Sequence, residues 1–192
     1  AGVLTVPGKT EDLRDCVINR LLEVEPNTLL IHRLDRDTSG ILVFGLSKWG
    51  QKTISRQFQE RETSKTYQAV VAGHLDGQGT VDVPVIYDPE HPPLHIADAT
   101  HHKPAFTHWQ ATEHFEIQGQ AVTRVELTPI TGRSHQLRVH MQYLGHPIIG
   151  DTLYASTAQQ QLAQRLCLHA ERLSFYHPQT EQEVAFYAPV PF

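Results

Sequence analysis

Asp35 is the first residue of this 192-residue chain whose setting suggests chemistry. It lies in the segment IHRLDRDTSG, residues 31–40, between Arg33 and Arg36 and just before an apolar run. A nearby positive charge favours the ionised form of an aspartate, so we expect Asp35 to be a carboxylate. A carboxylate of this kind suits a nucleophile or an ion-pair partner better than a general acid. The alternative is an ordinary charged turn on the surface.

A second segment, TGRSHQLRVH at residues 131–140, combines arginines with histidines. Arg138 falls near the start of an expected helix, where the helix dipole disfavours a cation unless an anion is close by. His135 and His140 are five residues apart and would point roughly 140° away from each other on a helix. Helical zinc ligands are typically four residues apart, so we expect these histidines to be hydrogen-bonded loop and cap residues and not metal ligands.

The third segment is SKTYQAVVAG, residues 64–73, whose composition is typical of a strand. Lys65 and Tyr67 are two residues apart and therefore project from the same face of that strand. An aromatic ring beside a cation can stack on a nucleic-acid base. A tyrosine packed in the core is the alternative that spacing alone does not exclude.

The elements that must position these segments follow from periodicity and capping. Apolar spacing predicts a helix over 11–24 that ends before Pro26. The run 39–46 reads as a buried strand, and Ser47 is a suitable cap for a helix that continues to Arg61. We further expect turns with short strands over 74–104, a hairpin formed by 106–115 and 121–130, a helix between Ser134 and Gly145, a helix over 157–165, and closing strands within 166–178 and 183–191.

The predicted fold class is therefore α+β with a mostly antiparallel sheet. The chain shows no internal repeat and no break in composition, so we expect a single domain over residues 1–192. Cys16 and Cys167 cannot form a disulfide framework, no apolar run reaches the ~18 residues of a membrane helix, and the opening AGVLTVPG does not resemble a signal peptide. These features favour a cytoplasmic protein.

The charge is unevenly distributed along the chain. The formal net charge is −5, which argues against a generally basic protein that coats nucleic acids. Residues 31–66, however, carry a net charge of +3, and residues 127–150 carry +2. The segments that contain the candidate reactive residues are thus predicted to form a basic region on an acidic protein.

Taken together, the segments resemble the RluA family of pseudouridine synthases, and the dual rRNA/tRNA type most closely. HRLDRDTSG resembles the catalytic phrase of the family, SKTYQAVVAG the phrase with the active-site tyrosine, and LTPITGRSHQLRVHMQYLGHPIIGD the phrase with the active-site arginine. LCLHAERLSFYHP resembles the closing segment. The order is that of the family along the whole chain, and the Lys-Pro of the opening phrase would precede Ala1, on a strand that we expect to be missing.

The resemblance implies an α+β core with a mixed, mostly antiparallel sheet, flanking helices and a central RNA-binding cleft. It implies that Asp35 is the nucleophile, attacking C1′ or C6 of a uridine, that Tyr67 stacks on the base, and that Arg138 pairs with Asp35. Arg33 would fill the gap left by the flipped nucleotide. The remaining expected site residues are Arg36, Lys65, Arg133 and His135 as RNA contacts, and Leu34, Leu137 and Leu168 around the pocket.

The expected substrate is a stem-loop in large-subunit ribosomal RNA or transfer RNA, because flipping a base costs least in a loop. No metal or cofactor is required, and we expect a monomer. Two alternatives come from other functional classes. One is a catalytically silent RNA-binding domain of the same fold, and the other is a metal hydrolase that uses His135, His140 or His146.

Overall fold

The computed structural model describes residues 1–192, which divide into two compact units. Unit 1 comprises Ala1–Lys65 and Ala170–Pro189, and unit 2 comprises Thr66–His169 and Val190–Phe192. Each unit has its own hydrophobic core. None of the helices combines the length and the apolar character needed to cross a membrane.

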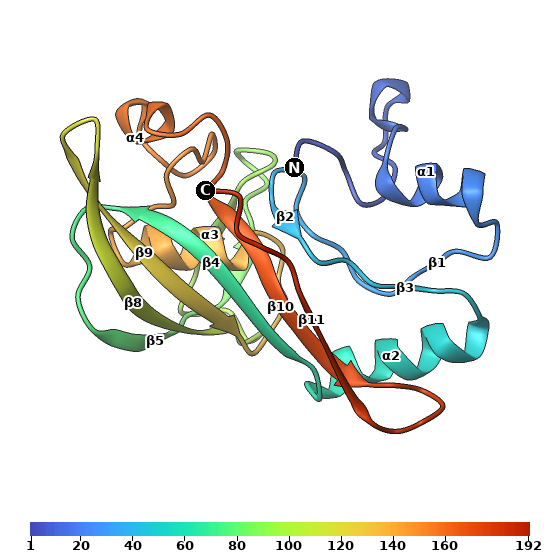
Figure 1. Cartoon of the computed structure of the whole chain (residues 1–192). Coiled ribbons are helices and arrows are strands. Elements are labelled where there is room, and N and C mark those ends of the chain that lie inside the picture. Colours follow the sequence, from blue (N-terminus) through green and yellow to red (C-terminus); the bar gives the residue numbers. More distant parts are fainter. The chain divides into compact units, whose positions relative to one another are not determined.

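Unit 1 packs two helices and several short strands (Figure 1). Its core gathers Ile54, Leu173 and Phe175, with Phe58 and Val184 partly buried against them. The strand pairs are β1 with β3, β10 with β11, and β2 with β10. Its elements are η1 (Glu11–Leu13), α1 (Val17–Val24), β1 (Leu29–Leu30), β2 (Ser39–Gly40), β3 (Phe44–Gly45), α2 (Lys48–Glu60), the first residues of β4 (Ser64–Ala72), most of β10 (Leu168–Tyr176), and β11 (Glu183–Tyr187).

The helix expected over 11–24 is interrupted. Only its second half, α1, is an α-helix, and η1 is a short 3₁₀ turn. Between them Cys16 is extended, fully buried and bridged in parallel to Leu4, and the Val17 amide donates to the Leu4 carbonyl at 2.8 Å. A pairing with a distant residue thus overrides the local helical periodicity. The end of the helix before Pro26 is confirmed.

The prediction of a single buried strand over 39–46 is also wrong, because this run forms two short strands, β2 and β3, with different partners. The change of partner occurs at Gly40, which has a φ of +115°. A Cβ at this position would lie 2.2 Å from the Ala170 carbonyl oxygen. Gly40 therefore allows β2 to approach β10 more closely than any residue with a side chain would permit.

Helix α2 forms where the sequence predicts it. The Ser47 hydroxyl accepts from the Gly50 amide at 3.0 Å, which confirms the predicted cap. Ile54 is buried on the inner face of the helix. The Gln57 carboxamide is also buried and hydrogen-bonds both backbone groups of Tyr176, which fixes α2 to β10.

Unit 2 is built on antiparallel strands (Figure 1). Strand β9 pairs with β4 on one side and β8 on the other, and β8 also pairs with β5. Leu137 and Met141 of α3 pack with Val125 and Leu127 of β9 in one core cluster. The elements are β4, β5 (Gln78–Asp82), β6 (Val85–Tyr87), β7 (His95–Ala97), β8 (Phe106–Ile117), β9 (Gln120–Pro129), α3 (Gln136–Tyr143) and α4 (Thr157–Gln161). The α+β class with a mostly antiparallel sheet is confirmed.

The predicted hairpin turn, the end of α3 and the start of α4 are confirmed in unit 2. Gln118 and Gly119 both have positive φ, 51° and 74°, as a two-residue hairpin turn requires. Gly145 has a φ of +83° just after α3, as predicted. Ser156 starts α4 with a capping box, although the helix stops at Gln161 and does not reach 165.

Candidate active site

In unit 1, the main chain around Asp35 is anchored by the N-terminal segment. The Thr5 hydroxyl donates to the Leu34 carbonyl at 3.0 Å, and the Leu34 amide donates back to it at 3.2 Å. The Gly2 amide donates to the Arg36 carbonyl at 2.8 Å, and Arg36 Nε donates to the Gly2 carbonyl at 3.3 Å. The backbone on both sides of Asp35 is therefore held by bonds to residues about thirty positions away in sequence. Such anchoring limits the conformations that the Asp35 backbone can adopt.

The turn that carries Asp35 closes on itself before β2. The Thr38 amide donates to the Asp35 carbonyl at 3.1 Å, and the Thr38 side chain is buried. The next residues enter β2, whose Gly40 contacts the Ala170 backbone. This arrangement is typical of reactive side chains, which are commonly placed on loops held by rigid strands.

His32 and Lys65 lie near one another in unit 1, and both are partly buried. The Val43 amide donates to His32 Nε2 at 3.0 Å, and the His32 ring stacks on Phe58 with a centroid distance of 4.6 Å. Burial, reinforced by the positive charge of Lys65, lowers the pKa of His32 to about 4. Burial and the neighbouring Arg61 also lower the pKa of Lys65. His32 is therefore a neutral hydrogen-bond acceptor that supports the loop.

This assignment predicts how stability depends on pH. The unfolded chain protonates His32 near pH 6.5, whereas the folded chain resists protonation until about pH 4. His32 should therefore lower the free energy of unfolding progressively as the pH falls from 6.5 to 4, by up to about 1.4 kcal/mol per pH unit. His32→Gln keeps an acceptor for the Val43 amide but does not titrate. Urea unfolding of both proteins between pH 7 and pH 4 checks this, and a constant stability difference would contradict it.

In unit 2, Arg138 is fixed by a buried ion pair. Its side chain is 3% exposed and that of Asp151 is 0% exposed. Arg138 Nε donates to Asp151 Oδ2 at 2.7 Å, and Nη2 donates to Asp151 Oδ1 at 2.6 Å. The guanidinium also lies over the Tyr154 ring, 5.0 Å from its centroid. A bidentate pair of this kind fixes both the position and the orientation of the guanidinium plane.

Asp151 is itself held by the turn that follows it. Its Oδ1 accepts from the Leu153 amide at 2.9 Å and from the Tyr154 amide at 3.2 Å. The Tyr154 hydroxyl accepts from the His95 amide at 2.9 Å and lies 2.6 Å from His135 Nδ1. Tyr154 therefore connects the two regions, because its hydroxyl contacts the start of α3 and its amide bonds the carboxylate that holds Arg138.

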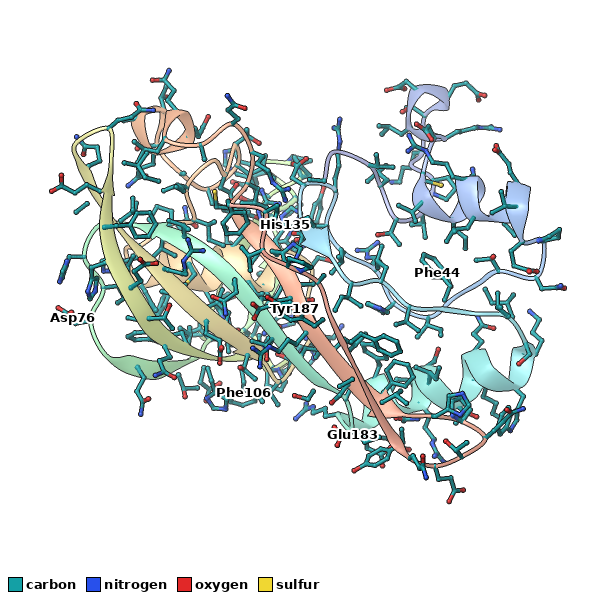
Figure 2. All side chains as sticks on the ribbon, viewed as in Figure 1. Phe44, Asp76, Phe106, His135, Glu183 and Tyr187 are labelled. Atoms are coloured by element: carbon teal, nitrogen blue, oxygen red, sulfur yellow. The ribbon has the colours of Figure 1, made fainter.

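The start of α3 differs from the prediction, because the cap is His135 and not Ser134. His135, labelled in Figure 2, has a left-handed backbone with φ of 55°. The turn is stabilised from within the helix, since the Gln136 carboxamide oxygen accepts from the Arg133 amide at 3.0 Å and from the Thr131 hydroxyl at 2.8 Å. The same carboxamide donates to the Phe106 carbonyl at 3.0 Å.

Asp151 is the site residue that the sequence analysis missed. The expectation that Arg138 needs an anion is met within unit 2 by this carboxylate, thirteen residues further along the chain. The signal in the sequence is the pair Gly150-Asp151, which indicates a turn. In the structure Gly150 has a φ of +73°, and a Cβ there would lie 1.9 Å from the Arg165 carbonyl oxygen. Glycine is required there, and it fixes the backbone that presents Asp151. The pairing of Arg138 with Asp35 stays a prediction.

Comparison with known proteins decides the family. A model of the RNA pseudouridylate synthase family matches residues 1–143. The chain belongs to this family. It is 46% identical over 193 residues to the dual-specificity RNA pseudouridine synthase RluA of Pasteurella multocida, and 44% identical over 194 residues to the Escherichia coli protein of that name. Each comparison covers 100% of this chain and 87% of the relative.

Solved structures agree with this result. Human RNA Pseudouridylate Synthase Domain Containing 1 matches with a TM-score of 0.81 and 28% identity, covering 100% of this chain and 85% of that one. Human RNA Pseudouridylate Synthase Domain Containing 4 shares the fold with a TM-score of 0.71 and 23% identity. The chain is therefore an RNA pseudouridine synthase, an isomerase that acts on RNA. The comparisons favour this function over a silent binding domain and over a hydrolase.

The other residues predicted for the synthase site lie at defined places in unit 2. Tyr67 stands opposite Leu127 in the pairing of β4 with β9 and packs against the core cluster. Leu137 and Leu168 are buried in that same cluster. Arg133 Nε donates to the Pro104 carbonyl at 3.3 Å. The roles of these residues toward RNA stay predictions.

Two of the histidines considered for a metal hydrolase have structural partners. His140 is fully buried, with Nδ1 2.8 Å from the Thr107 hydroxyl and Nε2 2.9 Å from the Val83 carbonyl. Burial lowers its pKa, which keeps it neutral. His146 Nδ1 lies 2.8 Å from the Ala72 carbonyl. Both histidines are hydrogen-bonded within unit 2, but His140 lies inside α3 and is fully buried, so it is not the loop or cap residue that the sequence analysis expects.

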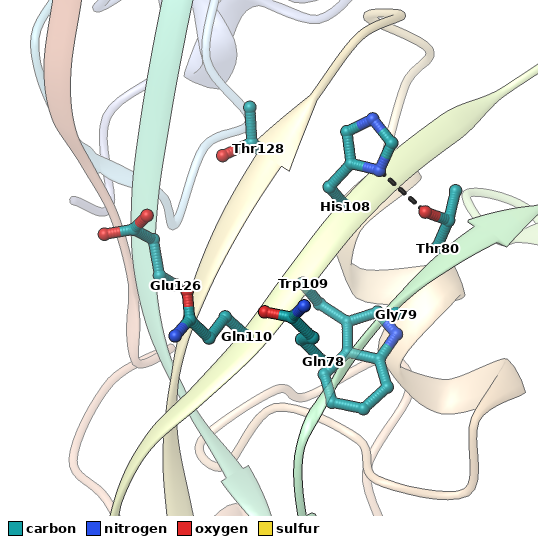
Figure 3. Close-up of a pocket in the computed structure, with 8 residues that line it drawn as sticks. All are labelled: Gln78, Gly79, Thr80, His108, Trp109, Gln110, Glu126 and Thr128. Atoms are coloured by element: carbon teal, nitrogen blue, oxygen red, sulfur yellow. Dashed lines mark hydrogen bonds between the residues drawn. The ribbon is translucent and has the colours of Figure 1, made fainter.

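A shallow hollow of about 380 Å³ lies on strands β5, β8 and β9 (Figure 3), and none of the predicted catalytic residues lines it. Its lining residues are Gln78, Gly79, Thr80, His108, Trp109, Gln110, Glu126 and Thr128. They include a carboxylate and no lysine or arginine. An RNA backbone is bound mainly by cations, so this hollow is unsuited to the phosphates of a synthase substrate.

Proposed function

We propose that this synthase isomerises uridines in stem-loops of both large-subunit ribosomal RNA and transfer RNA, with Asp35 as the nucleophile. The observation that carries the proposal is the 44–46% identity, over the full chain, to relatives described as dual-specificity RNA pseudouridine synthases. The segment HRLDRDTSG supports the assignment of Asp35, since it resembles the family's catalytic phrase. The proposed reaction needs no external co-reactant, because substrate and product are isomers.

The reaction requires one bond to be exchanged for another. The target uridine leaves its stack, because the reacting atoms are inaccessible within it. Asp35 attacks C1′ or C6, the N1–C1′ bond breaks, and the uracil turns so that C5 faces C1′. The C5–C1′ bond then forms, the bond between Asp35 and the nucleotide breaks, the C5 proton is lost, and N1 gains a proton. A carboxylate is an established type of covalent nucleophile.

The other residues have distinct proposed roles. Arg138 keeps Asp35 ionised and correctly aimed, and Asp151 orients Arg138 through the bidentate pair. Tyr67 stacks under the uracil and assists removal of the C5 proton. Leu34, Leu137 and Leu168 exclude water, which would otherwise intercept the intermediate. Arg33 fills the gap left by the flipped nucleotide, while Arg36, Lys65, Arg133 and His135 contact the RNA.

Charge distribution supports an RNA-binding face in this assignment. Residues 31–66 and 127–150 carry net charges of +3 and +2 on a chain whose total is −5. The acidic remainder should repel RNA elsewhere and so favour one binding orientation. We further propose that both units act as a single catalytic domain in a cytoplasmic monomer.

Release of tritium from RNA labelled at C5 of uridine tests the proposed substrates. Three RNAs are compared: an unmodified stem-loop from transfer RNA, one from large-subunit ribosomal RNA, and a fully paired duplex of the same length. We expect turnover of both stem-loops and little release from the duplex, because a paired base costs more to flip. Turnover of only one class of stem-loop would refute the dual substrate range. Turnover of the duplex at the same rate would refute loop recognition.

A further inference from the structure

Three side chains of unit 2 that the proposed reaction does not use converge at one end of the sheet. His74 and Asp76 lie in the loop between β4 and β5, and His114 lies on β8 opposite Thr123. Figure 2 shows Asp76 at this edge of the unit. The potential ligand atoms of the three side chains all lie within 4.8 Å of one another. They are exposed to solvent, so an ion would reach them without any opening of the fold.

The distances from the Asp76 carboxylate to the two imidazoles fit metal coordination. Asp76 Oδ1 lies 3.4 Å from His74 Nε2 and 3.4 Å from His114 Nε2. Two ligands bound at ~2.0–2.1 Å and at the tetrahedral angle are separated by roughly 3.3–3.4 Å. The two imidazole rings stack almost in parallel, with centroids 3.9 Å apart and an interplanar angle of 16°. Both Nε2 atoms approach the same carboxylate oxygen, but a metal ion lies in the plane of each imidazole that binds it, so one ring must rotate about its χ2 angle before both bind one ion.

The loop that supplies two of these ligands is well anchored. The Leu75 amide donates to the Thr123 hydroxyl at 3.0 Å, and that hydroxyl donates to the Gly73 carbonyl at 2.8 Å. The Gly73 amide donates to the Ala121 carbonyl, and the Leu75 side chain is buried. The backbone between His74 and Asp76 is thus held before any ion arrives, which reduces the ordering cost of binding.

We propose that His74, Asp76 and His114 form a binding site for one divalent transition-metal ion, with Zn²⁺ as the best fit. Two imidazole nitrogens and one carboxylate are ligands that zinc accepts, and solvent would complete the coordination. His114 Nε2 lies 2.9 Å from the Leu75 carbonyl, to which it donates in the apo protein. Ligation requires that proton to move to Nδ1 of the same ring, after which water satisfies the exposed carbonyl.

The expected consequence is structural, because the ligands belong to none of the segments assigned to catalysis. An ion held by both the loop and β8 binds the folded chain in preference to the unfolded chain, so it should raise the thermal midpoint of unfolding. The rate of pseudouridine formation at permissive temperature should stay the same with and without the ion. A negative result in the RNA assay would therefore not contradict the metal site. Absence of metal binding would likewise not contradict the proposed RNA substrates.

The test measures Zn²⁺ binding to the full chain, free of any histidine tag and stripped with a chelator. Competition against a chromophoric chelator should reveal one tight site per chain, and Co²⁺ should give the visible absorption of a nitrogen- and oxygen-ligated ion. His74→Ala, Asp76→Asn and His114→Gln should each weaken binding by roughly tenfold or more. His114→Gln keeps a donor for the Leu75 carbonyl, so it separates ligation from local hydrogen bonding.

His108→Ala is the matched control, since His108 is an exposed histidine of the same strand that hydrogen-bonds Thr80 at 2.7 Å. It should leave both the affinity and the metal-induced rise in thermal midpoint unchanged. The proposal is overturned by the absence of a tight site in the parent chain. It is also overturned if the three ligand variants bind Zn²⁺ as tightly as the parent chain does.

Discussion

Asp35→Asn is expected to lower tritium release from C5-labelled stem-loop RNA by a factor on the order of 10³ or more. The amide is close in size to the carboxylate but is not a nucleophile, so the covalent step is lost. The Thr38 amide donates to the main-chain carbonyl of residue 35, and the substitution does not remove this bond. The fold and the affinity for RNA should therefore stay close to those of the parent protein.

Asp37→Asn provides the matched control for this experiment. Asp37 lies in the same charged turn, two residues further on, and has no assigned role. Its replacement changes the net charge of the loop by the same amount, so any purely electrostatic loss of RNA affinity appears in both variants. If Asp35→Asn retained substantial turnover, or if both variants lost activity equally, Asp35 would not be the nucleophile.

Asp151→Asn is expected to have the second largest effect, because it removes the charge of the carboxylate that holds the buried Arg138 guanidinium in a bidentate pair. Breaking one side of a buried ion pair typically costs about 3–5 kcal/mol of stability. Both partners here are almost completely buried, and both bonds of the bidentate pair are affected. Chemical denaturation should show the loss of stability. The protein that remains folded should also isomerise uridine more slowly, because Arg138 is no longer oriented.

A double variant separates stability from catalysis. Arg138→Met combined with Asp151→Asn removes the unpaired buried charge, and the carboxamide oxygen at position 151 still accepts from the Leu153 and Tyr154 amides. We expect the double variant to recover most of the stability lost in Asp151→Asn while remaining inactive. Recovery of both stability and turnover would contradict the catalytic role of Arg138 and leave the pair as a structural feature only.

Elements fixed by local signals could be predicted from the sequence. Ser47 caps α2, Gly119 occupies the positive-φ position of the hairpin, and Gly145 ends α3. Each of these depends on bonds or backbone angles within a few residues. The residue types that favour such bonds and angles can be recognised in the sequence. Strand β9 follows the same rule, since its apolar residues alternate with charged residues and indicate one buried and one solvated face.

Elements decided by distant partners could not be predicted in this way. Cys16 interrupts the expected helix because it pairs with Leu4, and Gly40 divides an apolar run because β2 contacts Ala170. The start of α3 lies at His135 because the Gln136 carboxamide, held by hydrogen bonds to Phe106 and Thr107 of β8, stabilises the turn in place of Ser134. In each case a tertiary contact outweighs the local preference of the sequence.

The residues of the candidate site also divide into those with a local signal in the sequence and those decided by a distant partner. The need of Arg138 for an anion follows from its place near the start of a helix, and this need could be read from the sequence. The identity of the partner in unit 2 could not, because Asp151 reaches Arg138 only through the turn that Gly150 permits. A glycine followed by an aspartate indicates a turn, but it does not reveal which cation the carboxylate meets.

The most direct test of the central claim is a crystal structure of the Asp35→Asn variant bound to a stem-loop RNA that contains the target uridine. We predict that the uracil is flipped out of the loop and stacked on Tyr67, with Arg138 beside the side chain of residue 35. That side chain should lie within roughly 3–3.5 Å of C1′ or C6 of the same nucleotide. A uracil that remains stacked in the RNA, or a flipped base that meets only one of these three residues, would contradict the assignment.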